Sequence, residues 1–101
     1  MIVILTTIRK KENAAKIGDG LMHEQLIVCY NLFPVKAASV LQGRLVDENE
    51  TIMLMKTRGG NFDKVEAYIK DHATYEVPEV IPFSPDKVNF SYTKWMDAET
   101  N

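Results

Sequence analysis

The order of helical and extended segments is the feature of this sequence that most restricts its fold. Apolar residues recur at helical spacing in residues 12–26 and in a stretch of about ten residues that starts at Phe62. The extended apolar segments that accompany them cover residues 2–5, 37–46, 51–57 and 77–83. This order, β-α-β-β-α-β, predicts an α+β fold of the ferredoxin-like split β-α-β type, an antiparallel sheet with two helices on one face. A last amphipathic segment, 90–96, predicts a C-terminal helix.

The turns and edges of the sheet are predicted from polar stretches and prolines. Segments 37–46 and 51–57 are expected to form a hairpin, because the like-charged stretch "DENE" at 47–50 separates them by a usual loop length. The earlier apolar run 27–33 is expected to bend or to leave the sheet at Pro34. Two further prolines, Pro78 and Pro82, restrict the last extended segment to an edge of the sheet.

Glycine and asparagine mark special positions near the two helices. Gly18 and Gly20 each cost roughly 1 kcal/mol inside a helix relative to alanine. We expect Gly18 to face the sheet, where the missing side chain allows a close approach. Asn61 follows a Gly59-Gly60 break and is expected to cap the second helix.

One face of the predicted sheet has no helix to cover it. Met53 and Met55 alternate with Ile52 and Leu54, so the strand is apolar on both sides. We expect the two methionines on the open face, covered there by a neighbouring subunit.

Length and composition predict one small soluble domain over residues 1–101. The net charge of −2 argues against a nucleic-acid partner or an anionic membrane surface. No apolar run is long enough to span a bilayer, and the charges after the first run do not fit a secretory signal. The single cysteine, Cys29, excludes an internal disulfide and predicts a reducing, cytoplasmic location.

Few residues have the pattern of a catalytic or metal site. Cys29 in "LIVCYNL" is interpreted as a small buried apolar residue, with a reactive thiol or metal ligand as the alternative. His23 is expected on the polar side of the first helix, whereas His72 ends the second helix, where the helix dipole favours it. The sequence has no HxH, HExxH or CxxC spacing.

The carboxylates near the last strand leave two interpretations open. Glu76 and Glu79 are solvated edge residues, or Glu76 faces a cation such as Lys56 in a cleft. A pair of carboxylates serves as acid and base only where their environments separate their pKa values. No serine–histidine–acid set or phosphate-binding glycine loop accompanies them. We therefore predict a protein that is not an enzyme, with Cys29 or the Glu76/Glu79 pair as the less favoured catalytic alternative.

The sequence resembles the CutA family of divalent-cation tolerance proteins over nearly its whole length. The matching stretches are "VILTTI" at 3–8, "LIVCYNLFP" at 26–34, "GRLVDENETIMLMKT" at 43–57, "YEVPEVI" at 75–81 and "FSYTKWM" at 90–96. The resemblance implies a homotrimer of ferredoxin-like subunits, similar to the PII signalling proteins. It also implies tolerance to copper and other divalent cations, with these cations bound as the possible cofactor.

The same resemblance implies a ligand-binding cleft between subunits. It would bring together Cys29, Asn31, Lys56, Tyr75 and Glu76. The family usually has a histidine–proline pair before the tyrosine, where this chain has Ala73 and Thr74, so His72 is the nearest candidate metal ligand. A PII-like small-molecule sensor is the alternative function.

Overall fold

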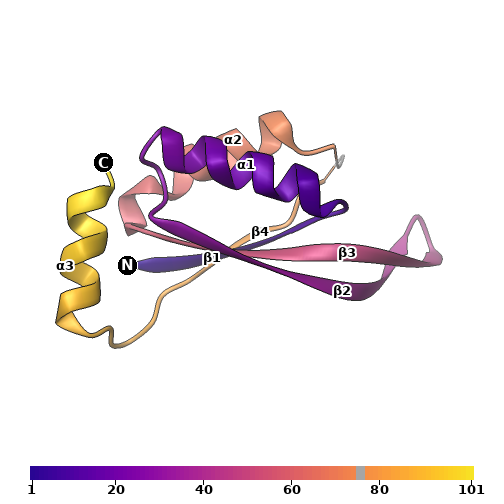
Figure 1. The fold of residues 1–101 in the computed structure, drawn as a ribbon. Helices are drawn as coiled ribbons and strands as arrows, with labels where there is room; N and C mark the ends of the chain where they lie inside the picture. The colour runs from indigo at the N-terminus through magenta and orange to yellow at the C-terminus, as the bar shows by residue number, and fades with distance from the viewer. Residues whose placement is uncertain (75–76) are drawn as a thin grey trace.

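The computed structural model describes residues 1–74 and 77–101, and it has the predicted order of elements (Figure 1). Its elements are β1 (Ile2–Ile8), α1 (Lys11–His23), β2 (Cys29–Leu41), β3 (Arg44–Thr57), the short 3-10 helix η1 (Gly59–Asn61), α2 (Phe62–His72), β4 (Val80–Phe83) and α3 (Phe90–Glu99). The ferredoxin-like β-α-β-β-α-β order and the C-terminal helix are confirmed. Both helices match the apolar spacing that predicted them, with α1 ending three residues early.

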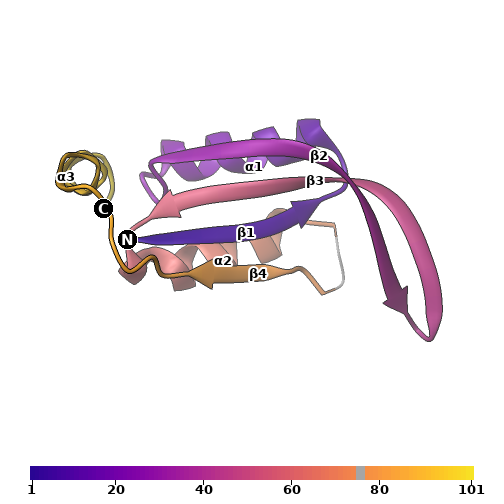
Figure 2. The same ribbon diagram turned by 90° about the horizontal axis from the view of Figure 1, so that it is seen from below.

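The four strands form one antiparallel sheet in the order β2-β3-β1-β4. Helices α1 and α2 lie together on one face of this sheet, and α3 lies beyond the end at which β1 begins (Figures 1 and 2). Among residues 1–74 and 77–101, strand β4 pairs only with β1, from Val3↔Phe83 to Thr6↔Val80. Pro82 therefore lies on an edge strand, as predicted.

The hairpin turn does not lie where the sequence predicted it. The turn is at Gln42 and Gly43, whose φ angles are 52° and 77°, the pair of positive values that a tight hairpin turn requires. Residues 47–50 continue β3 instead, because charged side chains are tolerated on a strand, and Glu48 there pairs with Arg9 at 3.0 Å. Pro34 also stays within β2, since β2 is an edge strand with one unpaired side.

The long hairpin extends past the rest of the sheet. Strand β1 pairs with residues 51–57 of β3 only, so residues 44–50 and their β2 partners project as a two-stranded ribbon (Figure 2). The molecule measures 45 × 27 × 21 Å as a result. At the tip, Leu45 is 89% exposed and Val40 is 68% exposed. An isolated two-stranded ribbon of this kind is only marginally stable in water. Packing against another protein surface would therefore stabilise the projecting part of the hairpin.

The core lies between the sheet and the two helices. Ile4 from β1 and Met55 from β3 are neighbours in register, and both are fully buried against Leu21 of α1 and Ile69 of α2. The prediction that Met53 and Met55 face the open side is thus wrong. Their alternation with Ile52 and Leu54 shows that two faces exist, but only pairing with β1 decides which one meets the helices.

Gly18 confirms the predicted close approach of α1 to the sheet. It is buried, and a Cβ atom there would lie 2.5 Å from Cδ2 of Tyr30 and 2.8 Å from Cε of Met53. The helix therefore packs on a tyrosine ring at a position where it has no side chain. This contact brings α1 close enough to the sheet to close the core.

Asn61 precedes α2 but does not cap it through its side chain. Its amide nitrogen Nδ2 instead donates to Oγ1 of Thr57 at 3.1 Å and to the backbone oxygen of Asn101 at 3.1 Å. The backbone nitrogen of Asn101 donates in turn to the carbonyl of Gln25. These bonds attach the C-terminus to the body of the domain and thereby fix the position of α3.

Candidate functional site

Three of the predicted site residues lie together on the open face of the sheet. Cys29 of β2 pairs directly with Lys56 of β3, and Asn31 lies two residues further along β2 on the same face. The ammonium of Lys56 donates to Oδ1 of Asn31 at 2.8 Å. Strand pairing therefore places a thiol, a cation and an amide within one small area.

Helix α3 adds a fourth residue that the sequence did not predict for this site. The hydroxyl of Tyr92 lies 3.5 Å from Sγ of Cys29, and its ring packs edge-on against Trp95. An ion pair between Arg58 and Asp97 at 3.5 Å helps to hold α3 in this position. Tyr92 lies 63 residues from Cys29 along the chain, so no local pattern joins the two.

Beside these residues the surface is hollowed. The hollow has a volume of about 440 Å³, and its lining includes Val3, Lys56, Lys87, Asn89 and Tyr92. Both charged side chains in its described lining are lysines. The hollow therefore favours an anionic or polar ligand over a free cation.

Cys29 is half-buried and lies outside the apolar core, which differs from the buried position expected from its apolar neighbours. It is a free thiol with the Tyr92 phenol as its partner. Throughout residues 1–74 and 77–101, no group of three or more histidine, cysteine or acidic side chains is placed to hold a metal ion. With Lys56 opposite Cys29, the described residues of one chain do not fit a divalent cation.

Of the other candidates, the described residues Glu79 and His72 are not joined to this area within one chain. Tyr75 and Glu76 lie outside the described residues. Glu79 accepts a hydrogen bond from Oγ1 of Thr7 at 2.7 Å, near the end of β1 opposite to the start that pairs with Lys56. His72 lies in the helical layer, with Nδ1 bonded to the carbonyl of Tyr68 at 2.8 Å.

The environment of Tyr92 gives a titration that can be measured. Burial, the hydrogen bond with Cys29 and the charge of the Cys29 thiolate together raise the pKa of Tyr92 to about 12, above the ordinary value of 10.0. A pKa raised by folding contributes stability that is fully present below pH 10.0 and is lost as the pH rises through about 12.

We therefore expect the Tyr92→Phe variant to lack one tyrosine ionisation near pH 12 that the wild-type protein shows. A titration of the folded protein, monitored by ultraviolet absorbance, measures this difference. The Cys29→Ser variant is the matched control. It removes the thiolate charge but leaves the burial, so the pKa of Tyr92 should fall and still exceed 10.0. A folded protein in which Tyr92 ionises at the ordinary pH would contradict the contact between α3 and β2.

The described residues include no helix that is long and apolar enough to cross a membrane.

Comparison with known proteins gives one consistent result. A family model described as CutA1 divalent ion tolerance protein matches residues 2–99. The divalent-cation tolerance protein CutA of Pyrococcus horikoshii is 34% identical over 100 residues, which cover 99% of this chain and 98% of that protein.

Solved structures agree over the whole length of the chain. The crystal structure of CutA1 from Pyrococcus horikoshii has a TM-score of 0.96 at 33% identity and covers 100% of this chain and 99% of that one. The periplasmic divalent cation tolerance protein CutA from Archaeoglobus fulgidus has a TM-score of 0.96 at 26% identity, covering 98% of each chain. The likeness to the CutA family noted in the sequence is thereby confirmed.

Proposed function

Because this chain belongs to the CutA1 divalent ion tolerance protein family, we propose that it acts in tolerance to divalent cations, copper among them. In this proposal it is a homotrimer of the cytoplasm that binds its ligand without catalysing a reaction. The family match over residues 2–99 carries the proposal. The free thiol of Cys29 supports the location, although the Archaeoglobus fulgidus relative is named as periplasmic.

The uncovered face of the sheet supports the trimer. Leu5 of β1 lies between Leu54 of β3 and Ile81 of β4, so an apolar row crosses the face opposite the helices. Ile81 is 43% exposed, and the projecting hairpin carries further exposed apolar residues at its tip. A ring of subunits, in which each hairpin reaches the next subunit, would cover both surfaces at once.

Cation contact requires ligands from more than one chain. Cys29 supplies one soft sulfur ligand, and His72 has one ring nitrogen, Nε2, with no bond to the described residues. We place the ligand-binding cleft at Cys29, Asn31 and Lys56 of one subunit, with Tyr75 and Glu76 as the further candidates. His72 is kept as a candidate metal ligand at its own position, and copper is the expected cation.

The surroundings of Cys29 support binding without catalysis. Within the described parts of the chain its thiol contacts the Tyr92 phenol, which keeps its proton at neutral pH because its pKa of about 12 lies far above 7. A nucleophilic cysteine needs a base or cation that stabilises the thiolate. A protonated phenol is a poor base, and the ammonium of Lys56, which pairs opposite Cys29, donates its hydrogen bond to Asn31. Slow alkylation of Cys29 in the folded protein is the expected result.

Solution mass combined with copper titration tests this function. We expect light scattering to give about three times the 11.5 kDa of one chain, and calorimetry to show saturable copper binding. Cys29→Ser and His72→Gln should each weaken that binding, whereas His23→Gln, on the exposed side of α1, should leave it unchanged. A monomer would refute the assembly, and a trimer that binds no copper would refute the metal role.

One observation favours a PII-like sensor of small anions as a second candidate. The two lysines around the hollow, Lys56 and Lys87, would attract phosphate or carboxylate groups. If this candidate is correct, nucleotides should raise the melting temperature of the protein in a thermal-shift screen. Lack of any shift at millimolar nucleotide, beside a clear shift with copper, would favour the cation function.

A further inference from the structure

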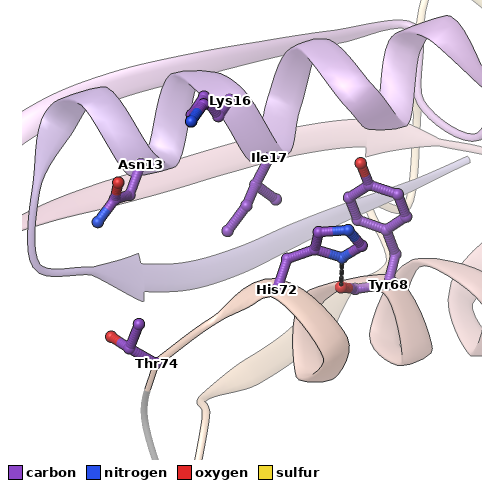
Figure 3. A pocket seen from close by; sticks show the side chains of 6 residues that line it. All are labelled: Asn13, Lys16, Ile17, Tyr68, His72 and Thr74. Carbon is purple, nitrogen blue, oxygen red and sulfur yellow. Dashed lines mark hydrogen bonds between the residues drawn. The ribbon is translucent and has the colours of Figure 1, made fainter.

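A second hollow lies in the helical layer, between α1 and α2 (Figure 3). It has a volume of about 420 Å³ and is lined by Asn13, Lys16, Ile17, Tyr68, His72 and Thr74. The proposed trimer uses the other face of the sheet, so this hollow, here called the interhelical groove, is independent of that assembly. Its volume is within the range of sites that hold small molecules.

Two aromatic rings form a fixed wall of the interhelical groove. Tyr68 and His72 stack with their centroids 4.0 Å apart and their planes 14° apart. Nδ1 of His72 donates to the Tyr68 carbonyl at 2.8 Å, because a carbonyl oxygen only accepts hydrogen bonds. This bond holds the imidazole and leaves Nε2 of the neutral ring as an acceptor.

A glycine in the facing helix makes room for this wall. A Cβ atom on Gly20 would lie 1.9 Å from the hydroxyl oxygen of Tyr68. Gly20 is thus the second glycine of α1, and the close approach of the Tyr68 hydroxyl explains why no side chain fits there. Ile17, which is 4% exposed, points from α1 toward α2 and forms an apolar floor (Figure 3).

Three polar side chains of the interhelical groove have no interaction partner among the described residues. The side chains of Lys16, Asn13 and Thr74 make no hydrogen bond or ion pair with residues 1–74 or 77–101. The described lining contains no carboxylate, and Lys16 is its one fully charged side chain. An uncommitted ammonium beside an aromatic wall offers one point for a negative charge and one surface for a flat ring.

We propose that the interhelical groove binds a small aromatic carboxylate. The ring of the ligand packs on Tyr68, His72 and Ile17, and the carboxylate accepts hydrogen bonds from Lys16, with Asn13 as a further donor. A single ammonium matches the single charge of a carboxylate better than the two charges of a phosphate monoester. Within one chain a metal ion is disfavoured here, because one imidazole is the only nitrogen or sulfur ligand in the described lining. A cation on His72 would need further ligands from a second chain.

Nuclear magnetic resonance titration of the full chain with benzoate tests this proposal. We expect saturable shifts of backbone amides in residues 13–17 and 68–74, with affinity in the millimolar range. Lys16→Met should weaken binding about tenfold, since it removes one charged hydrogen bond. Benzamide, which has the same ring without the charge, should bind the wild-type protein as weakly as benzoate binds that variant.

Lys64→Met is the matched control, because Lys64 is an exposed lysine of α2 outside the groove. It should leave benzoate binding unchanged. Tyr68→Ala removes the aromatic wall and should weaken benzoate and benzamide alike. Equal binding of benzoate by the wild-type protein and Lys16→Met, or shifts confined to the open sheet face, would overturn the proposal.

Discussion

Replacing Ile81 with glutamate is expected to convert the proposed trimer into a monomer of 11.5 kDa. Ile81 lies in the apolar row that crosses the open face and is 43% exposed in the single chain. Its replacement costs little in the monomer, where the carboxylate can reach water. Between packed subunits the same carboxylate would be desolvated without a partner, at a cost of several kcal/mol. Light scattering at fixed protein concentration measures the change.

The control places the same charge on the other side of the molecule. Ala67 is exposed on α2, in the helical layer, so Ala67→Glu should keep the trimer. Circular dichroism should show that both variants keep the native content of helix and strand. If Ile81→Glu remains a trimer of native mass, the open sheet face is not the surface that joins the subunits.

Replacing Gly18 with valine is expected to lower the free energy of unfolding by about 1–3 kcal/mol or more, the usual cost of overpacking a core. The first added atom would lie 2.5 Å from the ring of Tyr30, and that ring is held by a 2.7 Å hydrogen bond from its hydroxyl to Asp19. The gain in helix propensity over glycine is a fraction of 1 kcal/mol and is too small to compensate. Thermal unfolding at one protein concentration gives the difference.

Gly60 provides a matched control for this glycine substitution. No atom lies within 4 Å of a Cβ built on Gly60, so Gly60→Ala should change the melting temperature little. If Gly18→Val is as stable as the wild-type protein, the close contact between α1 and Tyr30 is incorrect. A smaller replacement, Gly18→Ala, should fall between the two.

The elements of the fold could be predicted because their signals are local. Apolar spacing marked both helices, and the prolines marked β4 as an edge strand. The hairpin turn was misplaced because acidic side chains at 47–50 resemble a loop in composition. The turn depends instead on positive φ angles at Gln42 and Gly43, and glycine is the residue that adopts them most readily.

The candidate site could be predicted only in part. Cys29, Asn31 and Lys56 were selected by family likeness, and strand pairing does bring them together. Tyr92 was missed because its contact with Cys29 depends on where the C-terminal helix is attached. That attachment rests on hydrogen bonds from Asn61 and Asn101, residues that a sequence pattern assigns to a helix cap and to a terminus.

The sequence by itself determined the order of the elements and the family. Each of these follows from patterns that repeat within a few residues, or from likeness over the whole chain. The tertiary structure alone decided that Met53 and Met55 face the helices, that Tyr92 reaches Cys29, and that a groove opens between α1 and α2. These features depend on strand register and on packing between distant segments, and a shift of one residue in register would exchange the two faces of a strand.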